Sequence, residues 1–173
     1  MKKAALALLL VPALSGCATG SPPSVSWSDS EIVGLLQAFH QVEIEQAAAA
    51  ADRASSPDVR RLAETLTEHH AAGLGVTREL ALANGLTLSS SDVSVQFEEN
   101  AARTLEVLRT WRDAGFDRNY LEVQVQQHQW ILDTIEDNLI PAAGNPALRD
   151  LLDTQRDSVS SHLAEATRLR GTL

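Results

Sequence analysis

Four residues that can bind a metal ion take the place of apolar residues in helix-like stretches of the sequence. In each stretch, apolar residues recur every three or four positions, and one titratable residue continues the series. These residues are Glu43, His70, His128 and His162. Because buried imidazoles and carboxylates lose hydration energy unless they are paired, a shared cation would stabilise them. The set predicts a site for a divalent transition metal, with zinc, iron, manganese or copper as candidates.

The depth of the four residues is consistent with one common site. Each lies within about two helical turns of the middle of its stretch, counted from the expected helix ends. Inward residues on facing helices of a bundle often build metal sites in this way. We therefore expect the four side chains to meet near mid-bundle.

The same pattern has a metal-free interpretation. A single inward histidine is usually a core residue that is hydrogen-bonded to a neighbouring hydroxyl or carbonyl group. In that case the domain would be a structural or protein-interaction module of the cell envelope. The Glu-x-x-His motif of di-iron bundles does not occur, and only its reverse is found, at 40–43 and 162–165. A mononuclear or purely structural site is therefore favoured, with His40 and His69 expected at the edge of the apolar stripes or in solvent.

Capping residues and prolines divide the chain into five expected helices. The first begins at the capping box 28–31 and runs to Ala54, the second runs from Ser56-Pro57 to Asn84-Gly85, the third starts after Ser91 and ends near Gly115, the fourth is capped by Asp117 and runs to Leu139, and the fifth runs from Asn145-Pro146 to Leu169. No segment alternates between apolar and polar residues for long enough to predict a strand. Short connections favour antiparallel neighbours, so the sequence predicts an all-α up-down bundle.

Length and composition limit the class of protein. A chain of 173 residues suits one domain, and its 44% hydrophobic content is sufficient for a core. A net charge of -9 makes a phosphate-binding surface unfavourable, so no nucleic-acid partner is expected. The chain has neither a Gly-x-Ser-x-Gly elbow nor a phosphate-binding loop. No catalytic residue is predicted, and an enzymatic role stays open.

The N-terminus has the pattern of an export signal that ends in a lipidation site. A positive n-region at 1–3, with Lys2 and Lys3, precedes an apolar run at 4–14, which is short for a membrane span. The sequence Leu14-Ser15-Gly16-Cys17 resembles a bacterial lipobox, and Cys17 is the single cysteine of the chain. An ordinary signal peptide with a chance cysteine is the alternative. We expect a signal peptide at 1–16, a lipidated Cys17 and flexible tether at 17–27, and a bundle domain at 28–173.

Lipidation would determine where the protein resides. Two or three acyl chains on Cys17 would hold the exported domain stably on a membrane. Ala18 stands where lipoproteins kept at the inner membrane often carry Asp, which favours the outer membrane. The expected location is therefore the periplasm-facing side of the outer membrane, with contact through the lipid anchor and an unknown protein partner.

Several motifs resemble the domain of unknown function 4142 family. They are Val42-Glu43-Ile44-Glu45, Ser56-Pro57-Asp58-Val59 leading to Glu68-His69-His70, Gly115-Phe116-Asp117-Arg118-Asn119-Tyr120-Leu121 leading to Gln127-His128, and Ser161-His162-Leu163. The resemblance implies an exported, often lipid-anchored bacterial protein with a ferritin-like antiparallel four-helix bundle and, here, an additional helix. It places the three candidate histidines on the family's histidine positions and Glu43 on the first Glu of its first-helix motif.

Overall fold

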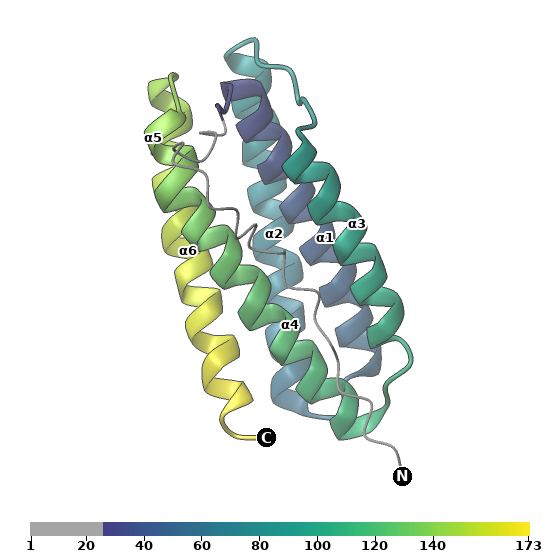
Figure 1. Ribbon diagram of the computed structural model, residues 1–173. Coiled ribbons are helices and arrows are strands. Elements are labelled where there is room, and N and C mark those ends of the chain that lie inside the picture. The colour runs from purple at the N-terminus through teal and green to yellow at the C-terminus, as the bar shows by residue number, and fades with distance from the viewer. Residues whose placement is uncertain (1–25) are drawn as a thin grey trace, which may run out of the picture.

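The computed structural model describes residues 26–173, which form helices joined by short connections (Figure 1). The elements are α1 (Asp29–Arg53), α2 (Pro57–Ala83), α3 (Asp92–Leu108), α4 (Asp113–Thr134), the π-helix η1 (Ile135–Leu139), α5 (Ile140–Ala142) and α6 (Pro146–Arg170). No strand occurs in this part of the chain, which confirms the all-α prediction. The expected signal peptide and Cys17 lie outside the described residues. Within 26–173, no helix combines the length and the apolar character that a membrane span requires.

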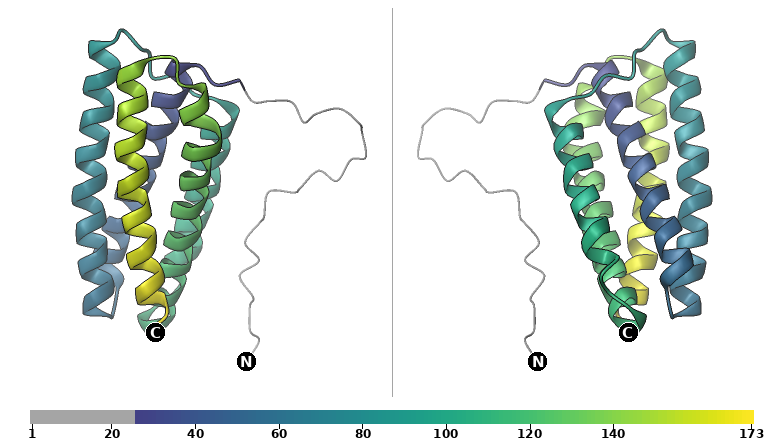
Figure 2. Two further views of the ribbon diagram at one scale, coloured as in Figure 1. Left: turned by 90° about the vertical axis from the view of Figure 1, so that its left-hand side faces the viewer. Right: turned by 90° about the vertical axis from the view of Figure 1, so that its right-hand side faces the viewer.

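Four long helices form an antiparallel bundle, and α3 is the additional helix. The packed pairs of the bundle are α1 with α2, α2 with α6, α6 with α4, and α4 with α1. Helix α3 packs against α1 and α4 on the outside, and the side views show α1 between α2 and α3 (Figure 2). Helix α3 runs in the same direction as α1 and opposite to α2 (Figure 1). Consecutive helices were expected to be antiparallel neighbours, but α3 packs beside α1 rather than beside α2, so the expectation does not hold for this pair.

The connection from α2 to α3 crosses the first turns of α1. The backbone amide of Ser89 donates to the carbonyl of Ser30, and the amide of Thr87 donates to the Ser30 hydroxyl. A Cβ atom on Gly34 would lie only 1.9 Å from the Ser89 carbonyl oxygen. The glycine therefore permits the close approach of this loop, which places α3 beside α1.

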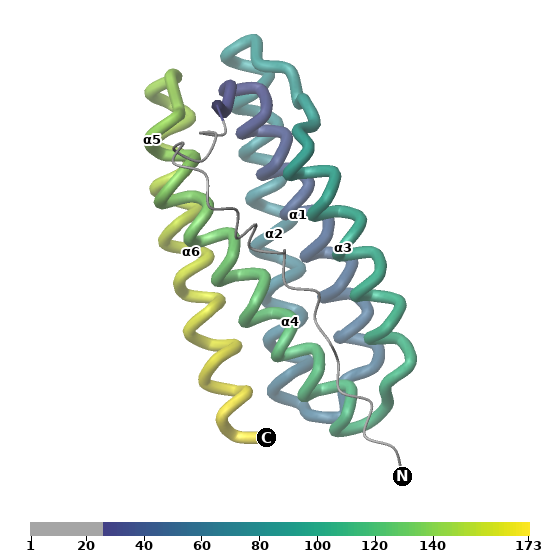
Figure 3. Tube along the Cα trace, in the orientation of Figure 1, coloured from purple at the N-terminus to yellow at the C-terminus, as the bar shows by residue number. Residues whose placement is uncertain are grey.

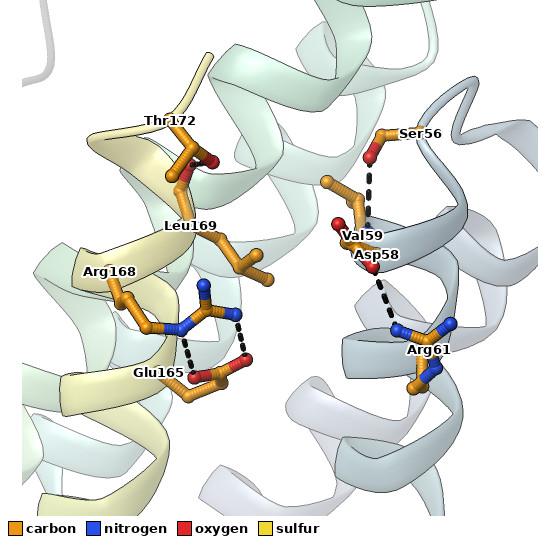
Figure 4. A network of polar contacts seen from close by, with 8 residues as sticks. All are labelled: Ser56, Asp58, Val59, Arg61, Glu165, Arg168, Leu169 and Thr172. Carbon is orange, nitrogen blue, oxygen red and sulfur yellow. Dashed lines mark hydrogen bonds and ion pairs between the residues drawn. The ribbon is translucent and has the colours of Figure 1, made fainter.

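Local capping explains where several helices begin. Ser28 and Glu31 form the predicted capping box of α1. The hydroxyl of Ser56 accepts from the Val59 amide before the first turn of α2, and the side chain of Asn145 accepts from two amides of α6. Figure 4 shows the Ser56 cap together with exposed ion pairs on α2 and α6. Exposed ion pairs of this kind contribute little to stability, so the caps are the stronger determinants of the helix ends.

Three helix boundaries differ from the prediction. Helix α3 ends at Leu108 rather than near Gly115, and α4 begins at Asp113. The backbone of Asp113 has a φ of 51°, so the chain turns sharply there through the left-handed region. The expected fourth helix continues past Leu139, because α4, η1 and α5 form one uninterrupted path (Figure 3).

Asp117 does not cap its own helix, which corrects the sequence prediction. It is 1% exposed and lies inside α4, and its carboxylate accepts hydrogen bonds from the amides of Ser55 and Ser56 and from the Ser55 hydroxyl. These partners lie at the corner between α1 and α2. The Asp117 part of the family motif therefore has a structural role: it joins α4 to the start of α2.

Asp117→Ala is expected to lower the free energy of unfolding by about 2 kcal/mol, because three hydrogen bonds to a charged acceptor are lost and two amides lose their partner. Urea unfolding measures the change. Asp150→Ala is the matched control, since Asp150 is exposed and lies in a helix whose start is already capped. Equal stability of the two variants would contradict this role for Asp117.

A layer of buried polar residues separates two hydrophobic clusters along the bundle. One cluster includes residues 32–42 of α1 and 148–159 of α6, and the other includes residues 47–50 of α1 and 116–123 of α4. Between them lie buried polar side chains from four helices: His40, Glu43, Gln46, His70, Gln124, His128 and His162. The titratable residues of the stripes thus lie near mid-bundle.

Candidate metal centre

Three of the predicted residues converge from three helices. His70 of α2, His128 of α4 and His162 of α6 each offer one ring nitrogen, and these nitrogens all lie within 4.8 Å of one another. Their ring centroids are 5.2 to 5.6 Å apart. The side chains are at most 6% exposed. The structure therefore brings the three imidazoles to one place in the polar layer.

Glu43 is buried close by but lies outside the group of three nitrogens. Its side chain is fully buried, and both carboxyl oxygens lack a hydrogen-bond partner in the described part of the chain. Burial raises the pKa of Glu43 to about 8, while the Gln124 side chain nearby acts in the opposite direction. The depth of Glu43 agrees with the prediction, but its carboxyl group is not part of the histidine group.

His40 is buried, contrary to the expectation that it lies at the edge of the stripe or in solvent. It is 2% exposed, and its Nδ1 lies 3.0 Å from Nδ1 of His70. The ring occupies space left by Gly73 of α2, where a Cβ atom would come within 2.5 Å of His40 Cε1. A glycine in the stripe of α2 was the sequence signal that a bulky side chain packs against it.

His69 is exposed, as predicted, but it also contacts the cluster. Its Nδ1 lies 2.9 Å from Nε2 of His162. All five histidines of the chain therefore gather in one region. Two of them, His40 and His69, form an outer pair that contacts the inner three.

The hydrogen bonds leave one free nitrogen on each inner histidine. Nδ1 of His128 lies 3.0 Å from the Gln124 carbonyl, which can only accept, so Nδ1 carries the proton and Nε2 keeps its lone pair. His70 contacts its outer partner through Nδ1, and His162 through Nε2. The remaining nitrogens, Nε2 of His70 and His128 and Nδ1 of His162, are buried without a partner. Metal-binding histidines commonly use their second nitrogen in this way.

The inner histidines are neutral at pH 7. Burial is the main cause: it lowers the pKa of His128 to about 3 and that of His162 to about 4, and it holds the pKa of His70 well below its ordinary value. Burial likewise lowers the pKa of His40 to about 4. Neutral imidazole is the form that binds a metal ion, so no proton has to leave these rings first.

The stability of the metal-free protein is expected to peak near pH 7. Between the lowered folded pKa values of the four buried histidines and their ordinary value of 6.5, the unfolded chain binds more protons, so stability rises with pH. Above about pH 7 the histidines are mostly neutral in both states, whereas up to about pH 8 only the folded chain keeps the proton of Glu43, so stability falls as pH rises. The Glu43 proton alone gives a slope of about 1.4 kcal/mol per pH unit, and the remaining titration of the histidines reduces the net fall from pH 7 to 9 to about 1 kcal/mol. Urea unfolding with EDTA at pH 5, 7 and 9 measures both effects, and Glu43→Gln should remove the alkaline fall. A steady rise from pH 7 to 9 would contradict the prediction.

Two glycines of α2 provide a matched test of the histidine packing. Gly73→Ala is expected to lower the free energy of unfolding by about 1–3 kcal/mol, since the new Cβ would displace the His40 ring. A Cβ atom at Gly75 would have no other atom within 4 Å, so Gly75→Ala should raise the free energy of unfolding by about 0.5–1 kcal/mol, because alanine favours the helix. Thermal and urea unfolding measure both changes. Changes of the same sign would show that His40 does not need this space.

The fold and the buried polar layer define a helical-bundle protein with a histidine cluster at its centre. The model of the family described as "Domain of unknown function (DUF4142)" matches residues 15–169, and the chain belongs to this family. Among the solved structures, "CopM in the Cu(II)-bound form" is similar with a TM-score of 0.65 and 16% sequence identity. The match covers 85% of this chain and 98% of that chain, and at this identity the likeness concerns the fold. No curated protein matches the sequence.

Proposed function

We propose that this protein binds one transition-metal ion at mid-bundle through His70, His128 and His162. The observation that carries the proposal is the convergence of three buried imidazoles, each with one nitrogen that has no hydrogen-bond partner. Nε2 of His128 carries no proton and can only accept, and when His70 and His162 donate to their outer partners, their free nitrogens can likewise only accept, so the three nitrogens do not satisfy one another. A cation pairs with all three at once, which removes the unfavourable burial of their lone pairs.

Three imidazole nitrogens favour metal ions of intermediate softness, which bind nitrogen ligands well. Three imidazoles suit zinc and copper well, and iron and manganese remain candidates. The similar protein CopM has a Cu(II)-bound form, which supports including copper. Titration of the chelator-treated protein with each metal tests the proposal, with saturation expected at one ion per chain.

Glu43 is the proposed fourth group. Its carboxyl oxygens are buried and unpartnered, and a dication at three neutral ligands favours a nearby negative charge. A change of its side-chain rotamer or a bridging water would connect it to the ion. If no protein group fills the fourth position, the ion keeps an open site, which an enzymatic role would require.

We further propose that the domain is exported and lipid-anchored through Cys17 at the outer membrane, facing the periplasm. The lipobox at 14–17 supports this location. Palmitate labelling that is lost in Cys17→Ser tests the anchor. Labelling that persists in the variant would contradict it.

A metal-free structural or interaction module is the second candidate function. It is favoured by the hydrogen bonds that each inner histidine already makes, to His40, to His69 and to the Gln124 carbonyl. In this case the titration shows no saturable binding of any of the four metals, and the histidines serve only to pack the core.

A further inference from the structure

A second group of buried polar side chains lies next to the histidine cluster. Glu43, Gln46, Tyr120 and Gln124 are each at most 1% exposed. Among these side chains, the structure contains one hydrogen bond, from Gln124 Nε2 to Gln46 Oε1 at 3.2 Å. Five of their polar atoms have no partner among the described residues: both Glu43 oxygens, Gln46 Nε2, the Tyr120 hydroxyl and Gln124 Oε1. So many unpaired atoms in one place indicate a bound partner.

The chemistry of these atoms identifies the kind of partner. Gln46 Nε2 is a donor, Gln124 Oε1 is an acceptor, and the Tyr120 hydroxyl can do both. A bare cation would pair with the oxygens but would leave the amide donor unsatisfied. Water donates and accepts, and buried waters typically make two to four hydrogen bonds to such groups.

The group lies between a surface groove and the histidines. Gln46 lines a groove of about 220 Å³ between α1 and α3, with the exposed residues Glu98 and Ala102 also lining it. On the inner side, the Gln124 carbonyl accepts from His128, and Glu43 follows Phe39 by one helical turn. The Phe39 ring packs in T-shaped arrangements with the rings of His70 and His128. The polar group therefore reaches from the groove, at Gln46, to the ring of His128, through Gln124.

We propose that Glu43, Gln46, Tyr120 and Gln124 form an internal water chamber, through which a water-sized ligand passes from the α1–α3 groove to the ion at the three histidines. The chamber itself rests only on the geometry of these side chains. The passage to the ion rests on the proposed function.

The metal-free protein tests the chamber. If water pairs with the Tyr120 hydroxyl, Tyr120→Phe removes a satisfied hydrogen bond, and the urea midpoint of unfolding falls. If the hydroxyl is buried without a partner, its removal raises the midpoint or leaves it unchanged, which would overturn the chamber. A high-resolution crystal structure of the metal-free protein should show ordered waters bonded to Glu43 and Tyr120. A dry group whose side chains pair with one another would also overturn it.

Azide binding to the Cu(II)-loaded protein tests the passage. Stopped-flow absorbance at the azide-to-copper band gives the second-order rate constant. Ala102→Trp should narrow the groove and lower this rate constant at least about fivefold. Val107→Trp, an exposed position on the same helix outside the groove, should leave it unchanged. Equal rates in the two variants would overturn the passage, and a chain that binds none of the four candidate metals would overturn it together with the proposed function, whereas the Tyr120 test still decides the chamber.

Discussion

His128→Ala is expected to weaken metal binding by about three orders of magnitude, a substantial part of the free energy that typical multi-ligand sites provide. His128 is the most buried of the three histidines, and its ring is fixed by the Gln124 carbonyl. Among the described residues, no other imidazole or carboxylate lies within 4.8 Å of the ligand atoms of both His70 and His162. The structure therefore offers no side chain that could replace His128 without a rearrangement. Competition with a chromogenic chelator measures the dissociation constant.

Two further variants should weaken metal binding by smaller factors. His69→Ala removes an outer partner of His162 and should weaken binding by about 10–100-fold, which is typical for groups that orient a ligand. Glu43→Gln removes the proposed negative charge and should weaken it by about tenfold, or about 1.4 kcal/mol. Circular dichroism checks that each variant is folded. Wild-type affinity in His128→Ala would contradict the proposed ligand set.

The second large expected effect is stabilisation by the metal. An ion that binds only the folded chain, at a thousand times its dissociation constant, raises the free energy of unfolding by about 4 kcal/mol. For a domain of this size, the melting temperature should rise by about 8–16 °C. Thermal unfolding with and without zinc or copper measures the shift.

The expected shift has a clear control. EDTA should abolish it in the wild type, and at the same metal concentration it should shrink to about 1 °C in His128→Ala. Tight binding without any shift would indicate that the ion binds the unfolded chain equally well. The mid-bundle location would then be wrong, because a site built from three helices does not exist in the unfolded chain.

Local signals predicted most of the helix starts. The capping box at 28–31, Pro57 and Asn145 act through atoms within one turn, so the sequence is sufficient to place them. The end of α3 was not predictable in this way, because the apolar period continues to Trp111 while the chain turns at Asp113. Asp117 resembles a local cap, but its partners are about sixty residues away in sequence.

Some features of the candidate site were likewise predictable from local sequence, and others depend on packing between helices. Periodicity placed His70, His128 and His162 on the inner faces of their helices, and the structure has them there. Whether His40 faces inward depends on Gly73 of another helix, which periodicity along α1 does not contain. For Glu43, periodicity gave the depth but not the direction of the carboxyl group, since rotamers are set by the surrounding packing.

The most direct measurement is an anomalous-scattering crystal structure of the protein loaded with zinc or copper, recorded at the absorption edge of that metal. We expect one peak at mid-bundle, about 2.0–2.1 Å from Nε2 of His70, Nε2 of His128 and Nδ1 of His162. A peak at any other place in the molecule, or none at mid-bundle in fully loaded protein, would contradict it.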